Sequence, residues 1–288
     1  PDLNEELDDS QLTGTVKLAY HPNDNTLTYA SFATGYKAGG TNTDRILPSL
    51  SPLFDAEKSR SAEIGIKHDF EEYGVRVNAA AHYTQISDFQ ATTFTGTGFN
   101  LQNAGDIIVK GIELEATWLM TESTELHAVA SRTLANFDEF KRGTCWVAYT
   151  WHTGIDDPGR VEPNDPFCSR DGDRVGFEPQ NSLSLMLNHY FEVGNYPASA
   201  SIDYQYTGDV FLDDANDPYK YADDFSLFNV RVSFTIPQWD SEIIAWSRNV
   251  FDEEYVARSG FDVPVQTGKI MAYPGAPRSF GVTFRKSF

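Results

Sequence analysis

The sequence has no long hydrophobic run: none of its apolar stretches approaches the ~18 to 20 residues that a membrane-spanning helix needs. Its 288 residues are nevertheless 40% hydrophobic and 14% aromatic, which is too apolar for a disordered chain and sufficient for one large folded domain. If the chain crosses a membrane, it must do so with strands, which carry their apolar residues at alternate positions.

Basic residues are also scarce. The chain has 22 Lys and Arg against 42 Asp and Glu, a formal net charge of −20. A nucleic-acid partner would call for a basic face, so this balance argues against nucleic acid.

Catalytic motifs are missing as well. We find no nucleophile elbow, phosphate loop, metal-ligating histidine pair or dinucleotide fingerprint, and the six histidines are scattered along the chain. The sequence therefore predicts no enzyme, no catalytic residue and no cofactor.

Only two cysteines are present, Cys145 and Cys168, both in one polar segment rich in Gly, Pro and Asp. No His or further Cys stands at metal spacing, which makes zinc a poor fit. We favour a disulfide between them, stapling a surface loop in an oxidising compartment, over two free thiols.

The acidic clusters at 213–217 and 223–224 could hold calcium, but without the EF-hand spacing a solvated loop is favoured. No metal site is predicted.

Alternation of apolar and polar residues is what the sequence does offer, and it predicts about eleven strands of roughly 9 to 13 residues. The connections alternate strictly between short turns and long loops. In membrane barrels, short turns lie on the periplasmic side and long loops outside. The expected strands are 13–20, 26–37, 58–70, 75–87, 106–118, 124–137, 181–191, 198–207, 225–236, 241–249 and a last strand after Pro277.

A soluble β-sandwich or propeller is the alternative. Its inward faces would bury large apolar residues, and its loops would not sort by length to one side. Here the polar faces carry many charges, which a hydrated lumen accepts and a dry core does not. They include Glu63, Lys67, Arg76, Glu113, Glu115, Asp203 and Arg231. We therefore favour an all-β, transmembrane antiparallel barrel.

Five segments resemble TonB-dependent outer-membrane receptors. The run N-V-F-D-E-E-Y at 249–255 and the run Y-P-G-A-P-R at 273–278 resemble the end of these proteins, and segments 29–40, 57–67 and 109–115 match upstream. The last strand resembles the closing strand of such barrels, whose aromatic end is part of the signal for the barrel-assembly machinery. The residues that would carry this signal are Phe280, Val282, Phe284 and the terminal Phe288.

The resemblance implies a fold, a location and a mechanism. Family barrels have about 22 strands, so residues 1–288 correspond to the C-terminal half of one, in the bacterial outer membrane. The plug, the TonB-binding segment and the early strands are not in this sequence, which has no initiating Met and is expected to be processed or partial. Its partners would be TonB with the inner-membrane energising complex, lipid or lipopolysaccharide, and a small-molecule ligand.

The implied function is energised uptake of a scarce solute, for which a ferric siderophore or other iron chelate is the first hypothesis. The external loops are acidic, which argues against an anionic siderophore. Cationic or neutral chelates, cobalamin and oligosaccharides therefore stay open as alternative cargoes. A passive porin-like or surface-binding barrel, and a fragment without activity, are the other hypotheses. Ligand contacts are expected from aromatic and polar groups at the loop tips and lumen mouth, although an interfacial or loop-packing role competes for each of them. The candidates are Tyr36, Lys37, Tyr149, Trp151, His152, Tyr219, Tyr221 and Arg258.

Overall fold

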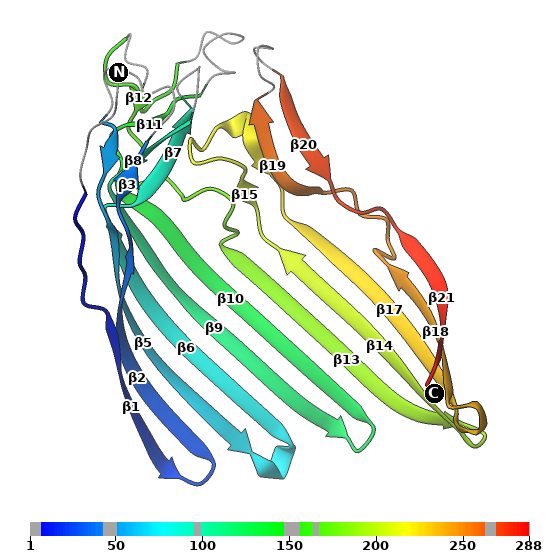
Figure 1. The fold of residues 1–288 in the computed structure, drawn as a ribbon. Helices are drawn as coiled ribbons and strands as arrows, with labels where there is room; N and C mark the ends of the chain where they lie inside the picture. The colour runs from blue at the N-terminus through cyan, green and yellow to red at the C-terminus, as the bar shows by residue number, and fades with distance from the viewer. Residues whose placement is uncertain are drawn as a thin grey trace.

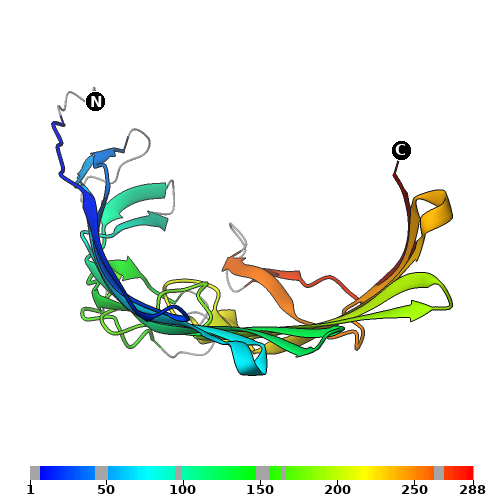
Figure 2. The ribbon, with the colours of Figure 1, turned by 90° about the horizontal axis from the view of Figure 1, so that it is seen from below.

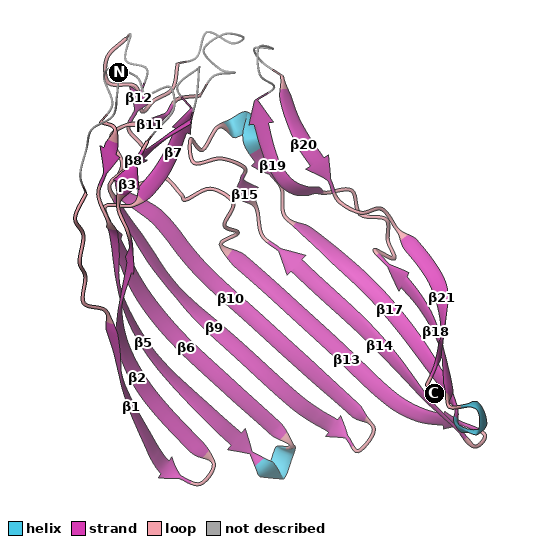
Figure 3. Ribbon diagram, viewed as in Figure 1, coloured by secondary structure: helices cyan, strands magenta, loops and turns pink. Residues whose placement is uncertain are grey.

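The computed structural model describes residues 7–42, 51–94, 99–146, 156–163, 167–262 and 269–287. Its main feature is an antiparallel sheet of eleven strands in the order β1-β2-β5-β6-β9-β10-β13-β14-β17-β18-β21, which dominates the fold (Figure 3). No helix in these ranges is long and apolar enough to span a membrane. The sheet strands are β1 (Gly14–Asn23), β2 (Thr26–Lys37), β5 (Glu57–Phe70), β6 (Val75–Ser87), β9 (Asp106–Thr121), β10 (Thr124–Glu139), β13 (Asn181–Val193), β14 (Tyr196–Thr207), β17 (Phe225–Ile236), β18 (Ser241–Arg248) and β21 (Ser279–Lys286).

The connections sort by length to opposite ends of the sheet, as the sequence predicts (Figure 1). Tight turns join the strands at the lower end, two of them through the short 3-10 helices η1 (Glu71–Tyr73) and η3 (Pro237–Trp239). The long loops all leave the upper end, which we call the long-loop end. Each carries a two-stranded hairpin that the sequence pattern did not predict: β3 (Gly40–Thr41) with β4 (Leu53–Phe54), β7 (Gln90–Phe94) with β8 (Phe99–Asn103), β11 (Gly143–Thr144) with β12 (Phe167–Cys168), β15 (Val210–Phe211) with β16 (Tyr221–Ala222), and β19 (Val256–Asp262) with β20 (Ile270–Pro274).

Seen along the strands, the sheet is a curved trough (Figure 2). Strands β1 and β21 form its two edges and do not pair with each other. A membrane sheet cannot leave such edges open, because their backbone N–H and C=O groups would face lipid unpaired. The trough therefore has the shape of part of a barrel wall.

The two faces of the trough have opposite chemistry. Directly paired residues share a face, and the row Ile64, Ala81 and Ile112 is apolar. Ile64 and Ile112 are 63% and 60% exposed, so none of the described residues covers this part of the convex face. The next row, through Glu63, His82 and Gly111, is polar and faces the concave side. This is the pattern of a wall between lipid and water.

A small hydrophobic core lies where the loops fold onto the concave face. It consists of the buried side chains Ala91, Ala104, Ile107, Phe137 and Phe140. The rings of Phe137 and Phe140 are 4.9 Å apart. Gly105 has a φ of 127°, and a Cβ there would collide with the Glu139 carbonyl oxygen. Backbone sterics thus require glycine where the β7–β8 loop returns to the sheet.

The strand boundaries agree closely with the expected ones. Strands β2 and β17 match them at both ends, and the largest shifts lengthen strands at the turns, as in β9, which runs to Thr121. Phe280, Val282 and Phe284 lie on the convex face, at 80%, 73% and 60% exposure, while the terminal Phe288 is outside the described residues.

Leu114 lies midway along β9 on the convex face and gives a test of the face assignment. In the intact protein folded into lipid vesicles, Leu114→Arg should lower the free energy of unfolding by about 2 to 4 kcal/mol, because a charge at mid-bilayer loses its hydration. The matched change Glu113→Arg, on the concave face, should cost about 0.5 kcal/mol or less. Urea titration of both variants measures the difference, and equal costs would contradict the assignment.

Candidate functional site

A cavity of about 550 Å³ opens at the long-loop end, between the β14–β17 and β18–β21 connections. Its wall combines carboxylates with aromatic rings and, among the residues that the structure describes, contains no Lys or Arg. Charge of one sign in a cleft raises the local concentration of the opposite sign, and aromatic faces attract cations. We call this site the acidic cavity; the side chains that give it its chemistry are Tyr221, Asp223, Asp224, Phe225, Glu253, Glu254 and Tyr255.

Asn249 builds one wall of the acidic cavity. It follows β18 with a φ of 48°, a left-handed conformation that Asn tolerates, and is 5% exposed. Its side chain donates to the carbonyl oxygens of Glu253 (2.9 Å) and Ala276 (3.1 Å) and accepts the Glu253 N–H at 2.8 Å. One amide therefore closes the turn that carries Glu253 and ties it to the segment entering β21.

Asp252 and Arg278 add a second tie between the same segments. The Arg278 N–H donates to Asp252 Oδ1 at 2.8 Å, and the Arg278 guanidinium lies 3.9 Å from the Asp252 carboxylate. Gly275 donates its N–H to the Tyr255 carbonyl oxygen, and a Cβ on Gly275 would collide with the Tyr255 ring. The ring in turn stacks on Phe225, with centroids 4.2 Å apart. The two sequence runs near the C-terminus thus have a structural role: they position the cavity wall.

The opposite wall is held by Asp209 and Arg174. The Arg174 guanidinium donates to the Asp209 carboxylate at 2.7 Å, and this hydrogen bond holds the pKa of Asp209 below its usual range. Burial, followed by a hydrogen bond to Asp209, raises the pKa of the Tyr221 hydroxyl. Tyr221 is therefore neutral at physiological pH and offers the cavity a ring edge and a hydroxyl.

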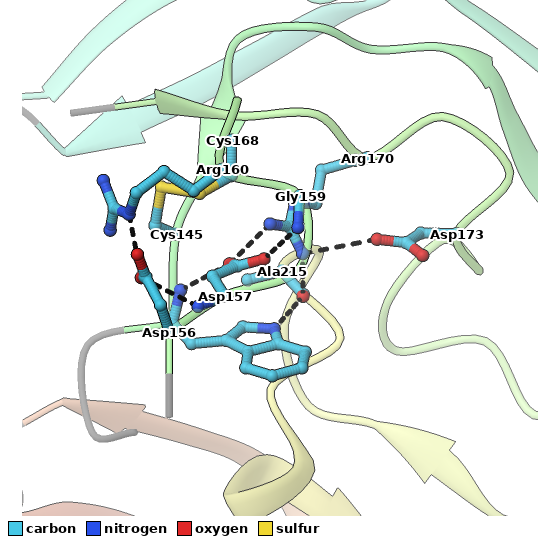
Figure 4. Close-up of a disulfide and its surroundings, with 10 residues drawn as sticks. Cys145, Asp156, Asp157, Gly159, Arg160, Cys168, Arg170, Asp173 and Ala215 are labelled. Carbon is cyan, nitrogen blue, oxygen red and sulfur yellow. Dashed lines mark hydrogen bonds and ion pairs between the residues drawn. A yellow bond between two sulfur atoms is a disulfide. The ribbon is translucent and has the colours of Figure 1, made fainter. Parts of the chain in front are cut away.

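At the long-loop end, a buried arginine joins two of the long loops (Figure 4). Arg170 is 1% exposed, and its guanidinium donates to Asp157 (2.5 Å), Asp173 (3.3 Å) and the Ala215 carbonyl oxygen (2.6 Å). Asp157 also accepts the N–H groups of Trp146 and Gly159, at 2.9 and 2.8 Å. A buried ion pair is stable only when its remaining hydrogen-bonding groups are satisfied, and these contacts satisfy the Asp157 carboxylate.

The Cys145–Cys168 disulfide lies next to this arginine (Figure 4). It closes a loop whose ends are 23 residues apart. Asp157 comes close to both sulfur atoms, and together they are the one potential metal-ligand group found in the described ranges. Because both sulfurs are in the disulfide, no thiolate is available and the group is not a metal site.

The acidic segment 213–217 differs from the expected solvated loop. Asp217 is 0% exposed and caps the 3-10 helix η2 (Pro218–Lys220) by accepting the Tyr219 N–H at 2.9 Å. Asp213 lies 2.8 Å from the ammonium of Lys220. Asp214 accepts the Gly176 N–H at 2.9 Å, and burial raises the pKa of its carboxyl. The protein itself supplies partners for these carboxylates, because Lys220 and the Tyr219 N–H of the same loop and the Gly176 N–H of the preceding loop contact them.

The structure places the predicted ligand residues in different surroundings. Tyr221 lines the acidic cavity, and Tyr219, two residues earlier, is 51% exposed beside it. Lys37 lies at the top of β2, 3.8 Å from Glu57. Tyr36 lies on the convex face, and its hydroxyl donates to Asp9.

The remaining predicted contacts are not located. Arg258 falls in β19, where only the backbone is described. Tyr149, Trp151 and His152 lie outside the described residues.

Sequence reasoning missed most of the cavity wall. The sequence predicts a solvated loop at Asp223 and Asp224, with calcium as the alternative, and gives Phe225 only a place in a strand. Glu253, Glu254 and Tyr255 belong to a recognised motif but were not assigned to a site. The available signal was that each acidic pair directly precedes an aromatic residue in a long connection: Asp-Asp-Phe at 223–225 and Glu-Glu-Tyr at 253–255.

Arg170→Leu should open the loop pair, since it leaves the Asp157 carboxylate buried without its cation at a cost of about 3 to 5 kcal/mol. Hydrogen exchange of the Trp146 and Gly159 amides, which donate to Asp157, should become much faster. The control Lys141→Leu breaks an exposed pair with Glu139 and should change little, since such pairs contribute about 0 to 1 kcal/mol. Unchanged hydrogen exchange in Arg170→Leu would show that this arginine does not hold the two loops together.

Thiol labelling tests the disulfide. Unfolded but unreduced protein should take up no alkylating reagent, and reduction should expose both cysteines of the chain. Intact mass spectrometry reads the number of adducts. Labelling without reductant would show that the bond is not formed.

Comparison with known proteins identifies the family. Residues 3–250 match the family model described as TonB dependent receptor-like, beta-barrel. The pesticin receptors of Yersinia pestis and Yersinia enterocolitica are 34% identical to this chain over 113 residues, a region that covers 38% of this chain and 16% of theirs.

Solved structures share the fold. The ferric yersiniabactin uptake receptor FyuA from Yersinia pestis superposes on 97% of this chain with a TM-score of 0.74 at 22% identity. The siderophore receptor PiuA from Acinetobacter baumannii superposes on 94% with a TM-score of 0.68 at 16% identity. The chain spans 38% and 35% of these two proteins. It therefore belongs to the TonB-dependent receptor family, a family of outer-membrane transporters and not of enzymes, and forms part of its β-barrel.

Proposed function

We propose that this chain is the ligand-capturing barrel wall of a receptor for TonB-energised uptake of an iron chelate. The observation that carries the proposal is the acidic cavity at the extracellular end, whose walls are fixed by Asn249, Asp252 and Arg278. A preformed concave site with a few oriented polar groups suits capture of a small molecule. The similarity to siderophore and yersiniabactin receptors supports iron as the cargo.

We further propose that residues 1–288 form the C-terminal strands of a closed barrel. The support is physical: β1 and β21 have free edges in the described sheet, and a membrane wall must pair them. Preceding strands would close the wall, and a plug with a TonB-binding segment would couple it to the inner-membrane energising complex. Antibody detection of the native protein at more than twice the 32.2 kDa of this chain is the expected result.

The ligand class follows from the charges. Asp223, Asp224, Glu253 and Glu254 face the acidic cavity, and the described part of its lining holds no basic residue, so a chelate of neutral or positive net charge fits better than an anionic one. Tyr221 and Tyr255 offer faces for planar groups. We propose Tyr219, Lys37, Arg258, Tyr149, Trp151 and His152 as further contacts from neighbouring loops. Tyr36, on the convex face, has the least support.

Uptake of radiolabelled ferric chelates by cells carrying the intact receptor tests this function. Replacing the four cavity carboxylates by amides should reduce uptake of a cationic chelate at least about tenfold, which corresponds to about 1.4 kcal/mol of lost attraction. The control replaces Asp24, Glu71, Glu72 and Glu122, at the short turns, in the same way. It removes the same charge and should leave uptake unchanged.

Two further conditions separate the alternatives. Deleting TonB should abolish uptake, and uptake that survives the deletion would mean a passive barrel. Preference for an anionic chelate would overturn the charge argument. Binding of cobalamin or an oligosaccharide in place of any iron chelate would overturn the choice of cargo while leaving energised uptake intact.

A further inference from the structure

Four basic side chains gather on the lipid-facing side of the sheet, away from the acidic cavity. They are Lys58 and Arg60 on β5, Lys110 on β9 and Arg132 on β10. All four are exposed. We call them the outer basic patch.

Strand register places the outer basic patch on the convex face. Arg132 pairs directly with Ile112, and Lys110 pairs with Tyr83. Arg60 and Lys58 share the face of Ile64 and Ile66, because they are an even number of residues away on one strand. Each basic residue therefore projects from the same surface as the apolar residues that meet lipid.

Strand tilt brings three of these residues to one level. The strands rise obliquely (Figure 1), so a row of paired residues climbs from β5 toward β10. Lys110 lies one row of outward-facing residues below Arg60, and Arg132 lies one such row below Lys110. Each step down by two residues along the strand compensates for the rise of the rows from β5 to β10. The result is a band of positive charge parallel to the membrane plane, with Lys58 above it.

The level of this band fits the outer membrane interface. Lys110 lies eight residues from Trp118 on β9, where Trp118 marks the periplasmic end of the apolar face. At about 3.3 Å per residue and a tilt of about 40°, the Lys110 backbone lies about 20 Å above that of Trp118, near the top of the ~25 Å apolar band of such barrels. The lysine side chain can extend upward from there and place its ammonium group at the edge of the band. The charged ends thus reach the head groups of the outer leaflet.

In the ranges that the structure describes, no carboxylate forms an ion pair with the outer basic patch, and Arg132 donates only to the Asn181 side chain, at 3.2 Å. On the convex face of β9 and β10, the nearest acidic groups come above it, at Asp106 and at the register shift next to Glu139, whereas Glu113 projects from the concave face. Glu139 pairs with Lys141 at 2.6 Å, and Asp106 accepts the Asp88 N–H at 3.3 Å.

The charges are also localised. Outward positions near the extracellular ends of β13, β14, β17 and β21 hold Asn181, Leu183, Tyr204, Tyr206, Phe228 and Phe280, with no Lys or Arg. A general need for solubility at the membrane edge would spread charge over all strands. The charges instead lie on β5, β9 and β10, within one run of four adjacent strands that includes β6, and this clustering indicates a polyanion that binds at one place.

We propose that the outer basic patch binds the phosphorylated sugar head of an outer-leaflet glycolipid, with Arg60, Lys110 and Arg132 contacting phosphate oxygens. Arginine forks match phosphate geometry, and Lys adds a point charge. The acyl chains of the same lipid would lie on Ile64, Ile112 and Leu114 directly below. One molecule would then use both the charge of the patch and the apolar wall.

Binding of purified lipid A to the intact receptor in detergent, followed by native mass spectrometry, tests the proposal. Each basic residue near an anionic membrane surface contributes about a fivefold gain in affinity. The triple variant Arg60→Gln, Lys110→Gln, Arg132→Gln should therefore bind bisphosphorylated lipid A about 100-fold more weakly. The control Lys17→Gln, Lys67→Gln, Arg231→Gln removes the same charge from the concave face and should bind as wild type.

Two other lipids sharpen the result. Monophosphoryl lipid A should bind more weakly than the bisphosphorylated form, and dephosphorylated lipid should not distinguish the triple variant from wild type. Equal affinity of the triple variant and wild type for bisphosphorylated lipid A would overturn the proposal, as would equal binding of the dephosphorylated lipid. Because any misfolded triple variant would obscure the comparison, the single variants Arg60→Gln and Arg132→Gln are measured too, each expected to lose about fivefold.

Discussion

Backbone pairing in lipid is the constraint on which the rest of the molecule depends. Every strand of the sheet from β2 to β18 has a hydrogen-bonded neighbour on both sides, because an unpaired N–H or C=O in hydrocarbon costs several kcal/mol. Once the ladder is fixed, the period-two geometry of a strand sends alternate side chains to lipid and to water. The same ladder fixes the tilt and register that place Arg60, Lys110 and Arg132 at one height, although they are far apart in the sequence.

The loops face a different problem, because they have water on most sides and no ladder to hold them. Three local devices replace it: the small hairpins, the Cys145–Cys168 disulfide, and polar side chains that each tie several backbone segments together. Arg170 and Asn249 are the clearest cases, each almost fully buried and each contacting segments from separate parts of the chain. A binding site assembled this way is rigid before the ligand arrives, which lowers the ordering cost of capture.

Alternation alone was sufficient to predict the eleven strands, their faces and the sorting of loops, since each strand carries its own pattern. The loop hairpins were not predictable, because β11 and β15 are two residues long and have no period. The burial of Asp217 could not be foreseen either, as its surroundings come from the fold. The face of Tyr36 was predictable, because it is four residues from Phe32 on one strand and residues an even number apart share a face. The alternation of that strand therefore places Tyr36 on the lipid side. The acidic cavity needed two loops to meet, which no local pattern encodes.

At the extracellular end, one sheet separates charges of opposite sign. The acidic cavity lies between loops over the concave side, and the outer basic patch lies on the convex side. An anionic head group on the outer surface is attracted by the patch and repelled from the cavity, so the abundant phosphates of the membrane do not compete for the ligand site. A cationic chelate, the ligand class we propose, would have the opposite preference. The sheet thus presents opposite charge on its two sides with the same alternation that separates lipid from water.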